Sequence, residues 1–143
     1  MKLSGAELDA DADTVAEAAL SAAQHQGARR LLDWIGVTHI TTEQAVAALL
    51  RRDPDDPHYR LLDAHEQRWA LAVARIAERS TRPGPTAADS RAVAAARDRG
   101  VTWAAIANEF EIAPQSVHGR YKAGAAARGG RRGPQRGGEP DPR

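Results

Sequence analysis

The chain has 143 residues, no cysteine and a formal net charge of +1. Its hydrophobic fraction is 42%, but 31 of these residues are alanine, and Leu, Ile, Val and Phe together make up only about 16% of the chain. Because alanine favours helices over strands, this composition excludes a large β-sheet fold and predicts an all-α protein with a thin core, or a partly disordered chain. The lack of cysteine also excludes disulfides and thiolate metal sites.

The first half of the sequence predicts a region of Ala-rich helices. Ser4-x-x-Glu7 and Thr14-x-x-Glu17 both have the form of a capping box, in which a hydroxyl and a carboxylate satisfy free backbone amides. We therefore expect helix starts at these two positions and a helix end at Gly27.

Two more helix starts are marked in this half. Thr41-x-x-Gln44 predicts a capped helix, and Asp56-Pro57 combines a preferred N-cap residue with proline at the first helical position. We expect the helix from Pro57 to continue to Ser80, which makes it the longest element at about 35 Å.

The second half begins with a predicted linker. Arg82-Pro83-Gly84-Pro85 cannot continue a helix. Three short helices follow, with Thr86 and Thr102 as caps of the first two and the third starting near Pro114. From residue 128 the chain is rich in arginine and glycine and cannot form a core, so we expect it to be disordered. The expected units are an acidic helical domain (1–82), a three-helix domain (83–127) and a basic tail (128–143).

The charge is divided between the two halves of the chain. Residues 1–79 carry a net charge of −4, and residues 80–143 carry +5. Such a sign change is typical of a protein with a nucleic-acid-binding end, although an arginine-rich coding bias is an alternative explanation. Only Lys2 and Lys122 of the 20 basic residues are lysine. This bias is typical of a GC-rich bacterial genome, and we find no secretory signal or membrane span, so we expect a cytoplasmic, nucleoid-associated protein.

Residues 100–121 carry the most informative pattern. They predict two short helices joined by a turn over residues 110–113. In the second helix only Val117 and Tyr121 are placed to face a core, and the other positions are polar, basic or small, with no acidic residue. A helix of this kind fits the major groove of DNA, as in a helix-turn-helix.

This segment resembles small bacterial helix-turn-helix proteins akin to the fourth region of sigma factors. The resemblance covers residues 86–125, and it implies a trihelical DNA-binding domain whose recognition helix starts near Pro114. The matching residues are Thr102, Trp103, Ile106, Ala107, Phe110, Ile112, Gln115, Ser116, Val117, His118, Arg120 and Tyr121.

The sequence departs from the family pattern at two positions. Glu111 occupies the turn position where the family has glycine, and a left-handed backbone there costs a non-glycine residue about 1 kcal/mol. Ala113 replaces the capping serine, with a loss of about 1 kcal/mol that Pro114 partly offsets.

The expected DNA contacts follow from side-chain chemistry. Gln115 suits a bidentate contact with adenine, and Arg120 suits guanine or a phosphate. Ser116 and Lys122 suit phosphate oxygens. His118 is either a donor to DNA or a solvated histidine. The full set of candidates is Thr102, Pro114, Gln115, Ser116, His118, Gly119, Arg120 and Lys122, with Arg128, Arg131 and Arg132 of the tail.

The arginines of the tail suit two kinds of nucleic acid. They are placed to add non-specific affinity for DNA or to reach a minor groove. The Arg-Gly-Gly pattern also resembles segments that contact RNA, which remains an alternative partner.

A helix-turn-helix unit usually acts as a dimer on repeated half-sites, so we expect an interface in the acidic half. The helix expected after Pro57 carries an apolar stripe with positions seven residues apart, a spacing that suits helix–helix packing. This predicts a homodimer or a protein partner bound through residues 1–80. The alternative is that the stripe buries the first helices of the same chain. Its members are Tyr59, Leu62, Trp69, Val73 and Ile76.

The sequence therefore predicts a DNA-binding transcriptional regulator that requires no cofactor or metal. The five histidines show no metal-ligand spacing, and no nucleophile or phosphate-loop motif is present, so we expect no enzyme. The alternative is an adaptor or sigma-factor-like partner of a larger complex that does not bind DNA on its own.

Overall fold

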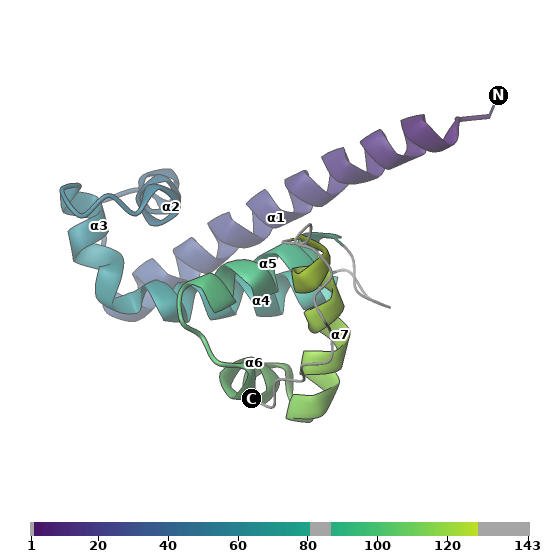
Figure 1. Cartoon of the computed structure of the whole chain (residues 1–143). Helices are drawn as coiled ribbons and strands as arrows, with labels where there is room; N and C mark the ends of the chain where they lie inside the picture. The colour runs from purple at the N-terminus through teal and green to yellow at the C-terminus, as the bar shows by residue number, and fades with distance from the viewer. Residues whose placement is uncertain (1, 81–86, 129–143) are drawn as a thin grey trace.

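The computed structural model describes residues 2–80 and 87–128, with residue 87 and residues 123–128 described by their backbone alone. Figure 1 shows that this part of the chain is built of helices, which confirms the all-α prediction. The predicted linker at residues 82–85, the cap at Thr86 and the tail residues Arg131 and Arg132 lie outside the described residues. The elements are α1 (Gly5–Ile35), α2 (Thr42–Arg51), α3 (Pro57–Leu62), the single 3₁₀ turn η1 (Asp63–His65), α4 (Glu66–Ser80), α5 (Ala87–Asp98), α6 (Trp103–Phe110) and α7 (Pro114–Arg128).

Helix α1 is much longer than expected. It has 31 residues and therefore extends over about 46 Å. Ser4 caps it as predicted, because its side chain accepts a hydrogen bond from the Glu7 amide at 3.1 Å. The second start predicted at Thr14 is wrong: Thr14 lies within the helix and its hydroxyl donates to the Ala10 carbonyl at 3.0 Å.

The helix end predicted at Gly27 is also wrong, because this glycine serves packing. A Cβ atom at Gly27 would lie 3.0 Å from Val73 Cγ2 and 3.4 Å from Trp69 Cδ1, so the position marks the close approach of α1 to α4. The Trp69 indole N–H also donates to the Gln24 carbonyl at 3.1 Å. The helix ends instead at Gly36, whose φ of +73° is the left-handed conformation that glycine favours.

The single helix expected from Pro57 to Ser80 is broken at η1. Seven residues span about 10.5 Å along a continuous helix, which would keep Tyr59 away from Glu66. The break between α3 and α4 brings these two side chains together, and the Tyr59 hydroxyl donates to Glu66. The predicted helix start is confirmed, since Asp56 accepts from the His58 amide at 2.9 Å.

The stripe predicted as a dimer interface lies inside the chain. Tyr59, Leu62, Trp69 and Val73 are buried and Ile76 is half-buried, in a fold where α4 packs against both α1 and α5. The structure agrees with the alternative interpretation, in which the stripe packs against helices of the same chain. These five side chains are therefore not available as an exposed interface.

One apolar core connects the two domains that the sequence predicts. Its buried members run from Ala23 of α1 through Trp69 of α4 and Val93 of α5 to Tyr121 of α7. The expected boundary near residue 82 falls between α4 and α5, and these two helices pack directly against each other. The acidic and basic halves of the chain consequently share a core.

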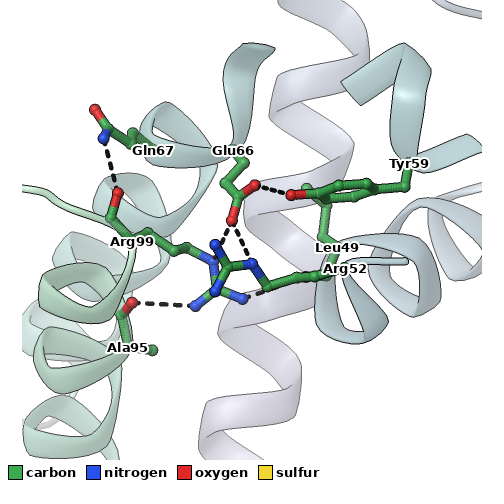
Figure 2. Close-up of polar contacts among 7 residues, drawn as sticks. All are labelled: Leu49, Arg52, Tyr59, Glu66, Gln67, Ala95 and Arg99. Atoms are coloured by element: carbon green, nitrogen blue, oxygen red, sulfur yellow. Dashed lines mark hydrogen bonds and ion pairs between the residues drawn. The ribbon is translucent and has the colours of Figure 1, made fainter. Parts of the chain in front are cut away.

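A buried carboxylate joins four helices near the start of α4 (Figure 2). Glu66 Oε2 lies 2.8 Å from Arg52 Nε and 3.2 Å from Arg99 Nε, while its other oxygen accepts from the Tyr59 hydroxyl. The Arg99 guanidinium also donates to the Leu49 carbonyl at 3.2 Å. The side chains of Glu66 and Arg99 are 9% and 8% exposed, so this network fastens α2, α3 and α5 to α4 in a region with little water.

The close approach at Gly27 yields a prediction about stability. We expect Gly27→Leu to lower the free energy of unfolding by about 1–3 kcal/mol or more, because the added side chain must displace Val73 and Trp69. Chemical denaturation monitored by circular dichroism measures this change. Gly5→Leu is the matched control, since nothing lies within 4 Å of a Cβ atom at Gly5. An equal loss in the two variants would contradict the packing role of Gly27.

Candidate nucleic-acid interface

The turn between α6 and α7 is tight and closed by backbone hydrogen bonds. Glu111 adopts the left-handed conformation, with φ 60° and ψ 42°, and its amide closes the end of α6. The Ile112 amide donates to the Ala107 carbonyl at 3.1 Å. Glutamate therefore takes the backbone conformation that suits glycine here, at a cost of about 1 kcal/mol.

Both helix starts predicted in this unit are present. The Thr102 side chain accepts from the Ala105 amide at 3.0 Å and so caps α6. Helix α7 begins at Pro114, and the Ala113 carbonyl accepts from the Val117 amide at 3.2 Å in its first turn. The alanine at this position contributes no side-chain cap, and proline at the first helical position supplies the favourable backbone angle.

The inner face of α7 is fixed by Val117 and Tyr121, as predicted. Both side chains are buried in the core, and the Tyr121 ring meets Phe110 of α6 edge to face at 6.1 Å between ring centres. The Tyr121 hydroxyl donates to Asp89 Oδ2 of α5 at 2.8 Å, and Asp89 is only 1% exposed. This bond fixes the rotation of α7 about its own axis relative to α5.

A second buried carboxylate attaches the unit to α4. Glu78 Oε1 lies 3.3 Å from Arg75 Nη1, and Glu78 Oε2 lies 3.6 Å from Arg120 Nη1. Arg75 also donates to the Phe110 carbonyl, at 3.2 Å. Arginines from α4 and α7 thus converge on one glutamate, and they connect both helices of the unit to the body of the protein.

Arg120 was predicted to read guanine or bind phosphate, and the structure turns its side chain towards α4. The side chain is 33% exposed and pairs with Glu78. It lies at the edge of the outer face of α7, where its charge is partly balanced by the glutamate. The ion pair connects α7 to α4.

His118 packs against a neighbouring ring. The rings of His118 and Trp103 meet edge to face at 5.1 Å, and the Arg97 guanidinium lies 4.6 Å from the centre of the Trp103 ring. His118 is half-buried. The expectation of a freely solvated histidine at this position is therefore wrong, because Trp103 covers one side of the imidazole.

The remaining predicted residues of α7 form a continuous outer face. Gln115, Ser116, Gly119 and Lys122 are all exposed, on the side opposite Val117 and Tyr121. We call these four residues the outer face of α7. It contains one basic and no acidic side chain.

Two further predicted residues are exposed at helix starts. Pro114 is the first residue of α7, and Thr102 is the N-cap of α6. Two exposed carboxylates precede α7 in the sequence, Glu109 on α6 and Glu111 in the turn. Arg128 ends α7, and only its backbone is described.

Sequence reasoning missed the residues that hold this unit in place, namely Arg75, Glu78 and Asp89. A signal was present for Asp89, because residues 89, 93 and 96 have the i, i+4, i+7 spacing of one helix face. An acidic residue on an apolar face indicates a buried carboxylate that requires a partner. Its partner, Tyr121, lies 32 residues away in the sequence and follows only from the fold.

Within the described part of the chain, no group of three or more His, Cys, Asp or Glu side chains is arranged to hold a metal ion. No helix in residues 2–80 and 87–128 is long and apolar enough to cross a membrane. Comparisons with protein-family models, curated proteins and solved structures found no match to this chain.

The two tyrosines of the chain provide a pH-dependent prediction. Burial and the hydrogen bond to Asp89 raise the pKa of Tyr121, and the hydrogen bond to Glu66 raises the pKa of Tyr59. Unfolded tyrosines ionise near pH 10, so this stabilisation is complete below about pH 10 and is lost as the pH rises through the higher folded-state pKa values.

We expect the free energy of unfolding to fall above about pH 10, and phenolate absorbance to appear together with unfolding. Tyr121→Phe should lower the free energy of unfolding at neutral pH by about 1.5–3 kcal/mol, because it removes a hydrogen bond to a buried carboxylate. Because phenylalanine does not ionise, this variant should also lose less stability than the wild-type protein when the pH rises above about 10. Denaturation at a series of pH values measures both effects. Ionisation of both tyrosines near pH 10 in the folded protein would contradict these bonds.

Proposed function

We propose that this protein binds double-stranded DNA with the outer face of α7 in the major groove, and that it acts as a transcriptional regulator. The observation that carries the proposal is the outer face itself, a set of exposed small, polar and basic residues on α7, the helix that follows α6 across a tight turn. Gln115 and Ser116 offer hydrogen-bonding groups to base edges, and Lys122 offers a charge to phosphate.

Gly119 supports a close approach to an external partner. This glycine lies inside a helix, where it costs about 0.5–1 kcal/mol relative to alanine. Among the described residues nothing lies within 4 Å of a Cβ atom at this position, so packing against them does not require glycine. A smooth patch between Gln115 and Lys122 allows the helix backbone to come near the base edges in a groove.

The buried contacts of α7 support the same proposal. Tyr121 bonded to Asp89, and Arg120 paired with Glu78, hold the helix in one orientation before any ligand binds. The backbone of such a helix does not have to be ordered on binding, which favours specific recognition. The exposed carboxylates of Glu109 and Glu111 repel phosphates, so the proposed contact excludes them.

Lys122→Ala tests the phosphate contact. We expect a several-fold loss of affinity for duplex DNA and a decrease of about 1 in the slope of log K against log salt concentration. Fluorescence anisotropy with labelled duplexes, at a series of salt concentrations, measures both quantities. Arg30→Ala removes one exposed charge from α1 and should leave the binding unchanged. Equal effects of the two substitutions would mean that α7 has no special role.

Gly119→Ala separates binding from stability. We expect this variant to be more stable by about 0.5–1 kcal/mol and yet to bind DNA more weakly, because the added methyl group enters the contact with the groove. Denaturation and anisotropy are measured on the same preparation. If Gly119→Ala leaves the affinity for DNA unchanged while Lys122→Ala abolishes it, charge alone carries the binding.

A further inference from the structure

The N-terminal half of α1 extends beyond the packed body of the protein (Figure 1). Residues 5–15 of this helix are all exposed. Leu8 is 52% exposed and Val15 is 68% exposed, so two large apolar side chains are presented to solvent on an ordered helix. We call residues 5–20 the arm.

The apolar residues of the arm form one seam. Leu8, Ala12, Val15 and Ala19 follow one another at alternating spacings of four and three residues, the pattern by which a helix contacts another helix along its length. The helix packs inward through other positions, Ala16 and Ala23, which are buried. Ala16 lies four residues from Ala12 and three from Ala19, so the seam adjoins this packed face. Within the seam Ala19 is half-buried, whereas Leu8, Ala12 and Val15 are exposed to solvent.

The arm is also strongly acidic. It carries five carboxylates, and no lysine or arginine occurs between Gly5 and Ala28. Glu7 and Asp11 directly precede the seam residues Leu8 and Ala12, which places them along one edge of the seam. The five residues are Glu7, Asp9, Asp11, Asp13 and Glu17.

We propose that the arm is the docking site for a basic amphipathic helix of another protein. The charge complementarity selects a partner with lysine or arginine beside its apolar stripe. The seam is shallow because two of its four residues are alanine, so it accommodates larger aliphatic side chains from the partner. This proposal does not depend on DNA binding, since it concerns a different helix.

A second copy of this chain fits the arm less well. Two arms would bring ten carboxylates together, and two shallow seams would bury little apolar area compared with the roughly 1,200 Å² of a stable interface. A basic partner removes both problems.

The arm is folded before it binds. Ser4 caps α1, acidic residues near its N-terminus interact favourably with the helix dipole, and alanine has the highest helix propensity. A preformed helix avoids the cost of ordering on association.

The test uses the full chain and two synthetic peptides. The first carries leucine at the a and d heptad positions and lysine at the flanking positions, and the second has glutamate in place of every lysine. Fluorescence anisotropy of each labelled peptide is measured against the wild-type protein. We expect the lysine peptide to bind at least about tenfold more tightly than the glutamate peptide, with an affinity that falls as salt is added.

Substitutions then locate the site. Leu8→Gln with Val15→Gln keeps all five carboxylates and should weaken binding of the lysine peptide by about tenfold or more. Leu61→Gln is the matched control, because Leu61 is an exposed leucine on α3. Glu7→Gln with Asp11→Asn should reduce the salt dependence, whereas Glu43→Gln with Glu109→Gln, at exposed positions elsewhere, should not.

Three outcomes would overturn the proposal. The first is equal binding of the two peptides, and the second is an affinity that Leu8→Gln with Val15→Gln leaves unchanged while circular dichroism shows an intact helix. The third is a light-scattering mass that corresponds to a dimer for the wild-type protein and to a monomer for this double variant. A second copy of the chain would then occupy the seam.

Discussion

A buried carboxylate requires a partner, and α4 carries one at each end. Glu66 in its first turn binds Arg52, Arg99 and Tyr59, and this network holds α2, α3 and α5. Glu78 in its last turn binds Arg75 and Arg120 and so holds α7. Removing the arginines from such a pair leaves a carboxylate with little access to water, which costs about 3–5 kcal/mol. The arrangement of helices around α4 depends on this constraint.

Small side chains make the close packing around α4 possible. Large aliphatic residues are scarce in this chain, and alanine is the most frequent buried residue. Alanine and glycine allow helix axes to approach one another closely. Gly27 is the clearest case, with the Trp69 ring and Val73 in van der Waals range of the missing side chain. A thin core is therefore sufficient for both halves of the protein.

The local signals in the sequence predicted most helix starts. Ser4, Thr41, Asp56 and Thr102 each accept a hydrogen bond from an amide of the first turn, as their residue types indicate. The inward positions of α7 were also predictable, because helical periodicity alone places Val117 and Tyr121 on one face. These features depend on neighbouring residues, and a cap or a periodic face can be read without knowledge of the fold.

The sequence by itself therefore determined the helical class, the capped helix starts and the two faces of α7. Only the tertiary structure decided that Gly27 continues a helix, that the stripe from Tyr59 to Ile76 is internal, and that Arg120 pairs with Glu78. The physical reason is that each of these outcomes depends on a partner far away in the sequence. A glycine ends a helix or permits a close approach according to what packs against it, and an arginine binds whichever carboxylate the fold brings near.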